Sequence, residues 1–276
     1  MPRKPDWLKV RLGGDNEFKH VSDTLRSCGL HTVCDEARCP NKGECWGTGT
    51  ATFMILGDTC TRNCRFCAVK TSAHGEAVDD TEPARLADAV NQLKLKYVVI
   101  TSVDRDDLPD KGAQHYADCI KAVKKTGAMV EVLIPDYIGE ELASVVNAGA
   151  DVVAHNIEVV KSLQKIRDVR ASYAKSLNTL KEVNELSPDT LTKSSIMLGL
   201  GETADELFQV MDDLRGVGCD QLVMGQYLQP TLKQVPVTEY ISPETFKKYG
   251  KIAKTKGFKK VVASPLARTS YHAADA

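Results

Sequence analysis

The stretch Thr52-Phe-Met-Ile-Leu-Gly-Asp-Thr-Cys60-Thr-Arg-Asn-Cys64-Arg-Phe-Cys67 joins a short apolar run to three closely spaced cysteines. The run Thr52–Leu56 is continuously apolar after its first residue, which is typical of a strand buried on both faces of a parallel sheet. Three thiolates spaced by three and then two residues can hold one corner of an iron–sulfur cube, but a closed site needs a fourth ligand. The stretch therefore predicts the first strand of an α/β fold, followed by a metal site with one open position.

The same kind of apolar run recurs along the rest of the chain. These further predicted strands are Tyr97–Ser102, Val130–Ile134, Val152–Asn156, Ser194–Leu200, Gln221–Tyr227 and Lys260–Ala263. Helical patterns fill the gaps, and they are expected from Thr81, over Gln114–Lys125, Gly139–Asn147, Tyr173–Leu186 and Thr203–Gly216, and from Ser242 to Gly257. Strand–helix repeats of this kind form right-handed crossovers and a parallel sheet.

Six strand–helix units and a last strand predict an α/β fold of the partial (β/α)6 TIM-like barrel type, because a full barrel needs eight units. A doubly wound open sheet is the alternative, but no Gly-x-Gly-x-x-Gly follows the first strand. We expect an N-terminal extension over residues 1–50 that carries cysteines, the barrel over 51–265, and a short C-terminal closing segment over 266–276. In such a barrel the Cys60–Cys67 loop lies at the C-terminal ends of the strands, where active sites occur.

The amino-acid composition argues against several classes of function. Lys+Arg number 36 and Asp+Glu 37, which gives a net charge of −1 and no indication of nucleic-acid binding. No apolar run is long enough to span a membrane, and the first residues lack the apolar core of a signal peptide, so we expect a cytoplasmic protein. Of the nine cysteines, seven lie between Cys28 and Cys67. In a reducing compartment such clustered thiols favour metal ligation over disulfides.

A second set of three cysteines precedes the first strand. Cys34, Cys39 and Cys45 are separated by four and five residues, which is too wide for the usual zinc pairs. Two sets of three predict two clusters, each of which lacks one ligand. The alternatives are a single zinc-rich knot that joins both sets, half of a zinc site, and a redox dithiol at Cys64 and Cys67. Cys28, Cys119 and Cys219 fit neither set.

The Cys60–Cys67 loop resembles the signature of the radical S-adenosylmethionine (SAM) superfamily, which includes an aromatic residue before the last cysteine, here Phe66. The two cysteine sets together, with Cys39-Pro-Asn-x-x-Glu-Cys45-Trp between them, resemble the lipoyl synthase family. The resemblance covers essentially the whole chain. Its motifs are Thr101–Asp110, Glu131–Asp136, His155–Glu158, Arg167–Arg170, Ser194–Glu202, Gly225–Thr231 and Arg268–Tyr271.

The resemblance implies two [4Fe–4S] clusters and SAM as cofactors. Cys60, Cys64 and Cys67 would hold the cluster that cleaves SAM into 5′-deoxyadenosyl radicals. Cys34, Cys39 and Cys45 would hold a sacrificial auxiliary cluster together with a serine of a C-terminal Arg-Ser-Ser-Tyr motif. That motif reads Arg268-Thr-Ser-Tyr271 here, so Ser270 is the candidate ligand and Thr269 the reserve.

The implied activity is that of a sulfurtransferase. The family inserts two sulfur atoms at C6 and C8 of an octanoyl chain on a lysine of a carrier protein, and the auxiliary cluster supplies the sulfur. The implied partners are an octanoylated lipoyl carrier domain (2-oxoacid dehydrogenase E2 or glycine cleavage H protein), an electron donor and an iron–sulfur carrier that rebuilds the spent cluster. Another radical SAM enzyme that inserts sulfur or methylthio groups is an alternative, and a two-cluster electron carrier is a second.

Other candidate residues are polar groups at predicted strand ends and basic groups near the start. Ser102, Asn156 and Arg170 are expected to contact SAM, with Arg170 suited to its carboxylate. Phe66 is expected to shield the nearby cluster, while Arg62 and Arg65 would offset its negative charge. Lys4, Lys9 and Arg11 could bind an acidic carrier domain, or simply form a solvated surface.

Overall fold

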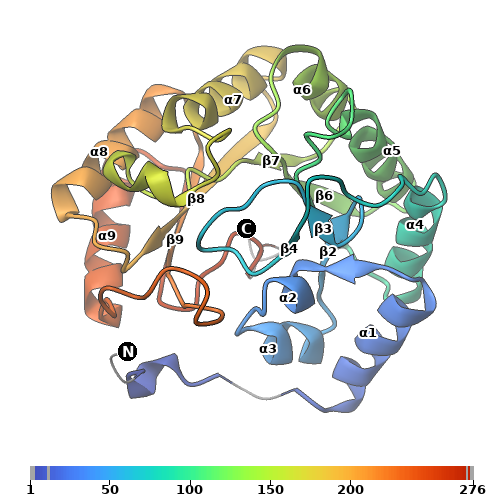
Figure 1. Cartoon of the computed structure of the whole chain (residues 1–276), viewed down its shortest axis with the longest axis horizontal. Helices are drawn as coiled ribbons and strands as arrows, with labels where there is room; N and C mark the ends of the chain where they lie inside the picture. The colour runs from blue at the N-terminus through green and yellow to red at the C-terminus, as the bar shows by residue number, and fades with distance from the viewer. Residues whose placement is uncertain (1–3, 11–12, 272, 274–276) are drawn as a thin grey trace.

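The computed structural model describes residues 4–10, 13–271 and 273, and its main feature is one curved, open sheet of eight strands (Figure 1). The strands follow the order β1-β2-β5-β6-β7-β8-β9-β10, and every pair is parallel except β1 with β2. Their bounds are β1 His31–Thr32, β2 Thr52–Ile55, β5 Tyr97–Ser102, β6 Met129–Leu133, β7 Val152–Ala154, β8 Leu191–Leu198, β9 Gln221–Gln226 and β10 Lys260–Ala263. A short separate ladder joins β3 (Thr59–Cys60) to β4 (Lys70–Thr71).

Helices connect the parallel strands and cover the outside of the sheet (Figure 1). They are α4 Glu82–Gln92, α5 Ala113–Lys124, α6 Gly139–Val146, α7 Tyr173–Leu186, α8 Ala204–Gly216 and α9 Pro243–Thr255, with a 3-10 turn η2 at Lys161–Ile166. Capping residues fix several of their starts: Thr203 forms a capping box with Glu206, and Ser172 and Ser242 accept hydrogen bonds from the first turns of α7 and α9. The predicted partial barrel of six strand–helix units and a last strand is confirmed.

Strand β8 begins three residues earlier than predicted. We expected a strand from Ser194, but β8 already begins at Leu191 and includes Lys193. Lys193 is buried because its ammonium binds the Glu131 carboxylate of β6 at 2.8 and 3.0 Å, and the same carboxylate accepts a hydrogen bond from the Tyr97 hydroxyl at 2.6 Å. A paired lysine can thus lie inside a strand that is otherwise apolar.

The N-terminal residues contain more regular structure than the sequence indicated. The helix α1 (Asn16–Ser27) begins at Asp15, whose carboxylate accepts a hydrogen bond from the Phe18 N–H, and it is followed by α2 (Val33–Glu36) and α3 (Lys42–Gly47). A 3-10 turn η1 (Asp6–Leu8) precedes them. Side chains of this segment, including Val21, Leu25 and Trp46, share one apolar core with the strands and helices of the barrel. The extension is therefore packed on the barrel and adds its edge strand β1.

The barrel core consists of two groups of buried apolar side chains, one around β2 and β5–β7 and the other around β8, β9 and α8. Polar side chains are buried mainly at the C-terminal ends of the strands and inside the barrel. Within the described part of the chain, every helix is too short or too polar to cross a membrane.

Candidate functional site

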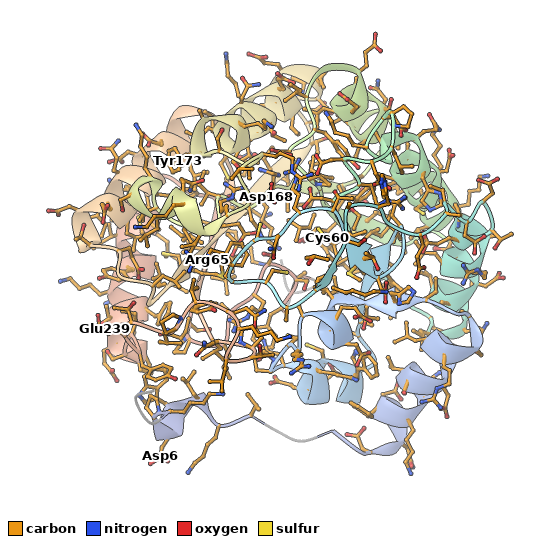
Figure 2. The ribbon with its side chains drawn as sticks, in the orientation of Figure 1. Asp6, Cys60, Arg65, Asp168, Tyr173 and Glu239 are labelled. Atoms are coloured by element: carbon orange, nitrogen blue, oxygen red, sulfur yellow. The ribbon has the colours of Figure 1, made fainter. Side chains whose placement is uncertain are left out.

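The loop that carries Cys60, Cys64 and Cys67 begins at a sharp change of direction after β2. Leu56 and Gly57 both have positive φ angles, 67° and 87°, and the Leu56 N–H donates to the buried Glu82 carboxylate at 2.9 Å. The chain then runs through β3, so that Cys60 lies at the end of a strand, and a turn closes where the Cys67 N–H donates to the Cys64 carbonyl. The loop lies over the C-terminal end of the barrel (Figure 2).

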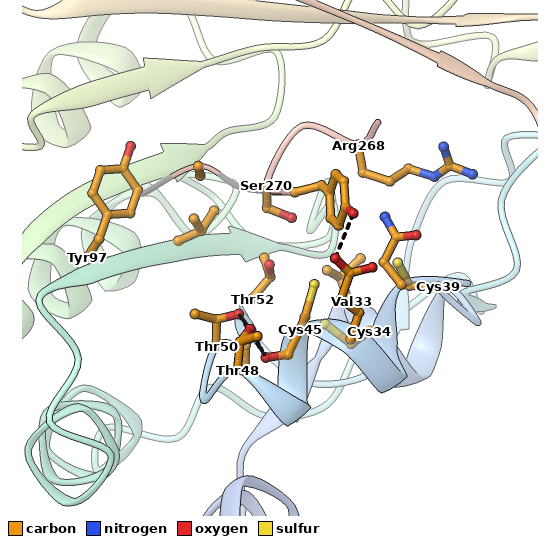
Figure 3. Close-up of a pocket in the computed structure, with 16 residues that line it drawn as sticks. Val33, Cys34, Cys39, Cys45, Thr48, Thr50, Thr52, Tyr97, Arg268 and Ser270 are labelled. Atoms are coloured by element: carbon orange, nitrogen blue, oxygen red, sulfur yellow. Dashed lines mark hydrogen bonds between the residues drawn. The ribbon is translucent and has the colours of Figure 1, made fainter. Parts of the chain in front are cut away.

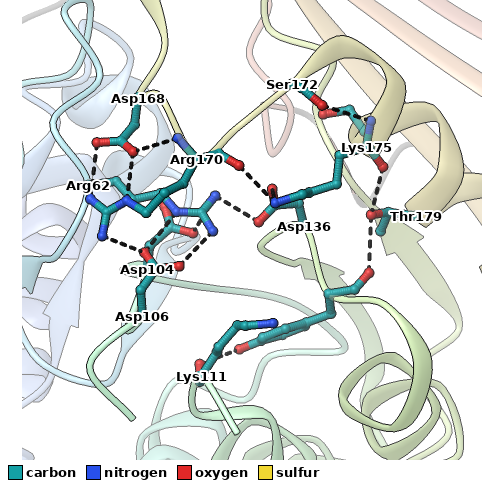
Figure 4. Close-up of polar contacts among 12 residues, drawn as sticks. Arg62, Asp104, Asp106, Lys111, Asp136, Asp168, Arg170, Ser172, Lys175 and Thr179 are labelled. Carbon is teal, nitrogen blue, oxygen red and sulfur yellow. Dashed lines mark hydrogen bonds and ion pairs between the residues drawn. The ribbon is translucent and has the colours of Figure 1, made fainter. Parts of the chain in front are cut away.

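Arg62 anchors this loop to the barrel. Its guanidinium binds Asp106 through two hydrogen bonds of 2.9 and 2.8 Å and pairs with Asp136 at 2.7 Å and with Asp104 at 3.4 Å (Figure 4). Burial alone would lower the pKa of Arg62, but the hydrogen bond to Asp106 and the nearby carboxylates raise it above its ordinary value. Arg62 is therefore a permanent cation that ties the loop to the ends of β5 and β6.

Asp168 fixes the same loop from the other side. Its carboxylate accepts the Asn63 N–H at 2.9 Å and the Arg170 side chain at 2.8 and 3.1 Å, and its own N–H points at the Cys64 sulfur at 3.3 Å (Figure 4). The hydrogen bonds from Arg170 hold the pKa of Asp168 well below its usual range. A backbone donor to sulfur is the kind of contact that tunes a thiolate ligand.

The three thiols of the loop suit metal ligation. Burial raises the pKa of Cys60 and of Cys64 to about 12, and the nearby Asp104 carboxylate adds to the effect on both. Burial raises the pKa of Cys67 as well. A buried thiolate becomes favourable when a metal supplies the compensating positive charge, since metal binding deprotonates a coordinating thiol. The donor set therefore fits a cluster corner.

A cavity of about 220 Å³ lies between this loop and the strand ends. Its lining includes the three cysteines and three of the predicted contacts, Phe66, Ser102 and Asn156. Among the described residues the buried Ser102 hydroxyl has no hydrogen-bond partner. A buried hydroxyl without a partner is costly, so this side of the cavity is prepared for a polar ligand.

The fourth predicted contact, Arg170, has other partners. Its guanidinium donates to Asp168 and to the Thr61 carbonyl at 2.5 Å, it pairs with Asp106 at 3.3 Å, and it is not among the residues that line the cavity. The sequence suggested a bidentate grip on a ligand carboxylate, but the structure shows the guanidinium engaged with this chain's own carboxylates. Arg65 is exposed and does not line the cavity either.

The second cysteine set forms its own cavity of about 380 Å³ (Figure 3). Cys34 lies in α2 and Cys45 in α3, and the Cys39 N–H donates to the Cys34 carbonyl, which closes the connection between the two helices. Burial raises the pKa of Cys34 to about 11 and that of Cys45 to about 12, with neighbouring cysteines of the set adding to the effect. The three cysteines therefore line one cavity, and its buried setting favours the thiolates of Cys34 and Cys45 only with a metal present.

The C-terminal segment completes this cavity. Arg268, Ser270 and Tyr271 line it opposite the cysteines, and Thr269 does not (Figure 3). The segment is held by the Asn41 side chain, which donates to the Leu266 carbonyl at 2.7 Å, and by the Tyr271 hydroxyl, which donates to Glu44 at 3.0 Å. Both anchors lie between or beside the cysteines of the set. The geometry brings Ser270 to the three thiols across more than 220 residues of chain.

Strand register sets the relative height of the two cavities. Thr52 pairs with Val99 and both line the Cys34 cavity, while Met54 pairs with Thr101 and both line the Cys60 cavity. Two residues along a strand correspond to about 7 Å. The two cavities are therefore successive layers of one barrel interior, and Val33 lines both. We call the Cys60 cavity the upper cavity and the Cys34 cavity the lower cavity.

The remaining cysteines lie apart from both cavities. Cys28 and Cys219 are buried, and Cys119 lies beside Glu82 and His115, whose ligand atoms all lie within 4.8 Å of one another. His115 binds the Glu82 carboxylate at 2.7 Å, and the same oxygen accepts the Leu56 N–H, so this group supports the start of the Cys60 loop. We assign no metal to it.

Several residues of the site were not predicted in these roles. Asp104 was expected only as a polar residue at a strand end, and Asp136 and Asp168 were predicted in no role, although both lie in motifs that we singled out. Asn41 and Glu44 were likewise missed, because their partners are in the C-terminal segment. Of the basic residues near the start, Lys4 is exposed, Lys9 pairs with Asp6, and Arg11 lies outside the described residues.

Comparison with known proteins agrees with this geometry. Residues 54–214 match the model of the radical SAM superfamily, and residues 1–39 match that of the N-terminal domain of lipoyl synthase. Among solved structures, methylornithine synthase is similar with a TM-score of 0.59 at 13% identity, over 76% of this chain and 63% of that one. The [FeFe]-hydrogenase maturase HydG is similar with a TM-score of 0.62 at 15% identity, over 76% of this chain and 51% of that one. These structural similarities show the barrel fold alone.

Curated relatives match over nearly the whole length. A lipoyl synthase of Caldanaerobacter subterraneus subsp. tengcongensis is 51% identical over 98% of this chain and 96% of its own. A lipoyl synthase of Methanocella arvoryzae is 50% identical over 99% of this chain and 94% of its own. With both cysteine cavities and the closing serine segment in place, the chain belongs to the lipoyl synthase family of the radical SAM superfamily.

Proposed function

We propose that this chain is a lipoyl synthase that inserts two sulfur atoms, at C6 and C8, into an octanoyl chain on a lysine of a carrier protein. The observation that carries the proposal is the pair of three-cysteine cavities stacked in one barrel, each one protein thiol short of four. An electron carrier would need neither an open iron position nor a barrel interior between two clusters.

Cys60, Cys64 and Cys67 are the proposed ligands of the cluster that works with SAM. The bound cluster and SAM supply a carbon radical that abstracts hydrogen from unactivated C–H bonds. Ser102 and Asn156 are the proposed contacts of SAM, since the Ser102 hydroxyl is unpaired and the Asn156 amide lines the same cavity. Phe66 lines the cavity beside the cysteines and shields that cluster from solvent. Arg170 acts by anchoring the cysteine loop through Asp168.

Cys34, Cys39, Cys45 and Ser270 are the proposed ligands of the auxiliary cluster that donates sulfur. A serine oxygen is a harder and weaker partner than a thiolate for a cluster iron, so the Ser270 bond can open when the cluster is consumed. Arg268 lines the same cavity and places a cation beside the negatively charged site. Ser270 is preferred to Thr269 because Thr269 donates to Asn156 at 3.1 Å and is not part of this cavity's lining.

The interior between the two proposed clusters has apolar walls that suit an alkyl chain. Met54, Val103, Leu133 and Ile134 are apolar walls of the upper cavity, and all but Leu133 are buried. His155, which lines the same cavity, is kept neutral because burial lowers its pKa to about 4. A reactive carbon radical needs a dry pocket to avoid side reactions, and the charged groups Arg62, Asp104 and Asp136 of the cavity wall are paired with one another.

The substrate is a lipoyl carrier protein, and we propose the E2 subunit of a 2-oxoacid dehydrogenase or the glycine cleavage H protein. An electron donor and an iron–sulfur carrier are required partners, because SAM cleavage consumes electrons and sulfur insertion consumes the auxiliary cluster. A second candidate function, another radical sulfur insertion or methylthiolation, shares the same first cluster and differs in the substrate.

Mass spectrometry distinguishes these functions. Anaerobically purified protein with both clusters is incubated with SAM, a strong reductant and an octanoyl-lysyl peptide. Lipoyl synthase activity adds two sulfur atoms to the peptide and yields 5′-deoxyadenosine. If 5′-deoxyadenosine forms while the peptide gains no sulfur, the radical machinery is intact and the proposed substrate is wrong. Iron analysis of the purified protein should give about eight irons per chain, and about four would contradict the two-cluster arrangement.

A further inference from the structure

Two turns beside the Cys60–Cys67 loop expose large aliphatic side chains almost completely. Val169 is 98% exposed and Leu232 is 84% exposed, the two largest values among the exposed large apolar side chains of the described residues. Val169 is the second residue of a turn that is closed by a hydrogen bond from the Ala171 N–H to the Asp168 carbonyl. Leu232 is the second residue of a turn that is closed by a hydrogen bond from the Gln234 N–H to the Thr231 carbonyl. Turn tips favour polar or small residues, so nothing within the turns themselves favours an aliphatic residue there.

The two turns flank the cysteine loop, and hydrogen bonds connect their segments to it. The Arg65 N–H donates to the Ile166 carbonyl at 2.8 Å on one side, and the Arg65 carbonyl accepts the Val235 N–H at 3.0 Å on the other. The Gln234 side chain also donates to the Cys67 carbonyl at 3.0 Å. Figure 2 shows Arg65 and Asp168 on the same face of the molecule, over the barrel end. The two aliphatic residues thus belong to one rim around the upper cavity, which Ala171 and Cys67 line.

The rim is also cationic. In residues 63–66, 165–170 and 231–234 the exposed charged side chains are Arg65, Lys165, Arg170 and Lys233. The one carboxylate in these stretches, Asp168, is buried and bound by Arg170. This concentration of positive charge stands out because the whole chain has a net charge of −1. Exposed apolar side chains within a field of one sign are features of a surface that binds a partner of the opposite sign.

We propose that Arg65, Lys165, Val169, Arg170, Leu232 and Lys233 form the docking surface for the carrier domain, and that this domain presents an acidic surface with an apolar patch next to its octanoyl-lysine. The inference rests on the proposed function, which requires a folded carrier to deliver one lysine arm into the upper cavity. Docking on the rim places the arm at the cavity mouth, while Val169 and Leu232 lose their contact with water. The cations steer the acidic domain into place.

The test compares two substrates and two kinds of variant. Val169→Asp with Leu232→Asp removes the apolar contacts and adds repulsion, and Lys165→Glu with Lys233→Glu reverses the charge. Neither pair touches a proposed cluster or SAM residue. Matched controls place the same substitutions elsewhere: Met129→Asp with Leu186→Asp at exposed apolar positions, and Lys247→Glu with Lys251→Glu on α9. Iron content and the thermal unfolding midpoint establish that each variant is folded and loaded.

Titration calorimetry with the octanoylated carrier domain measures binding, and sulfur insertion is measured on both the domain and a short octanoyl-lysyl peptide. We expect each rim pair to weaken binding of the domain about tenfold or more, with KM for the domain rising in parallel. KM for the peptide should stay within about twofold, because a short peptide does not span the rim. Binding of the wild-type protein should weaken as ionic strength rises.

The other outcomes distinguish a failure of the proposed docking surface from a failure of the proposed function. If the wild-type enzyme modifies peptide and domain while the rim variants bind the domain like the controls, the docking surface is wrong and the proposed function stands. Equal losses for peptide and domain would also overturn it, since they would place these residues in the substrate pocket. If the folded wild-type enzyme modifies neither substrate, the proposed function fails.

Discussion

At the scale of single residues, Thr269 and Ser270 are chain neighbours with different surroundings. The Thr269 hydroxyl donates to Asn156, which lines the upper cavity, while Ser270 lines the lower cavity with Cys34, Cys39 and Cys45. One short segment therefore contributes a link to one cavity and a proposed ligand to the other. The sequence could propose both hydroxyl groups as ligands but had no means of ordering them in space.

Ser270→Ala should make the auxiliary cluster labile. On the proposed ligand set, loss of the Ser270 oxygen would leave one iron with an unprotected position, so we expect chelator to remove that cluster's iron roughly tenfold faster or more. Ser270→Cys should slow the loss below the wild-type rate, since thiolate binds a cluster iron more strongly. Iron release to a coloured chelator measures both. Thr269→Ser is the control and should behave as wild type; fast release in Thr269→Val with slow release in Ser270→Ala would transfer the ligand role to Thr269.

His155 makes stability depend on pH. Its Nδ1 and Nε2 lie 2.9 Å from the Ile134 carbonyl and the Ser176 hydroxyl, and burial lowers its pKa to about 4. Below the unfolded pKa of about 6.5 the unfolded chain binds a proton that the folded chain does not, so stability is lost as pH falls. Between pH 7.5 and 5.5 the loss is about 1.4 kcal/mol from this group alone.

The variant His155→Gln isolates that contribution. Glutamine does not titrate, so all other pH effects, including cluster lability, are common to both proteins. The free energy of unfolding of wild type minus that of the variant, measured in urea, should shrink by the stated amount over this range. A constant difference would mean that His155 titrates with the same pKa in the folded and the unfolded protein.

At the scale of the element, the Cys60–Cys67 loop owes its shape to Arg62 more than to its own sequence. Only 6% of the Arg62 side chain is exposed, and it compensates Asp104, Asp106 and Asp136 together. Arg62→Met should destabilise the fold by about 3 kcal/mol or more, because it leaves Asp104 without its cation and leaves Asp106 and Asp136 with only their longer contacts to Arg170 and Lys175. The thermal unfolding midpoint should fall by roughly 6–12 °C. Iron retained by the Cys60 set should fall as well, because the loop loses its anchor.

Arg65→Met is the matched control for Arg62→Met. Arg65 lies in the same loop but is exposed, so its effect on the free energy of unfolding should stay within about 0.5 kcal/mol. Equal losses from both variants would show that the loop tolerates no arginine replacement and that the buried pairs have no special weight.

The helices and strands also show where sequence patterns are sufficient to predict the bounds of an element. The bounds of β5, β10 and α7 match the prediction residue for residue, because each is a clear apolar run or an amphipathic segment with a Ser cap. The helix α1 was missed among polar residues, although Asp15 caps it and Val21 and Leu25 are spaced four apart. The cysteine spacing predicted both site loops. It could not predict Asn41, Glu44 or Asp168 as their supports, because these contacts join distant segments.

At the scale of the whole molecule, the barrel stacks the two cysteine cavities one above the other. Neighbouring layers of β2 and β5 line the two cavities in turn, so the proposed substrate chain would extend along the barrel interior between them. Two reactive positions on an alkyl chain, C6 and C8, are about 2.5 Å apart, so small movements of the chain would present each in turn to fixed groups. On the proposed assignment of the clusters, the architecture would separate hydrogen abstraction from sulfur donation by cavity.

This separation predicts different defects from one cysteine of each set. Cys39→Ala should reduce the iron content from about eight to about four per chain, and it should leave 5′-deoxyadenosine formation measurable while abolishing sulfur insertion. Cys64→Ala should give a similar iron content but no 5′-deoxyadenosine. The two variants should differ because each cavity has its own three thiols, and Val33 is the only residue that lines both cavities.

Cys219→Ala, which alters a buried thiol outside both cavities, controls for the loss of a cysteine as such. Sulfur insertion by Cys39→Ala would show that the lower cavity is not the source of sulfur, whereas loss of 5′-deoxyadenosine in that variant would show that the two layers are not independent.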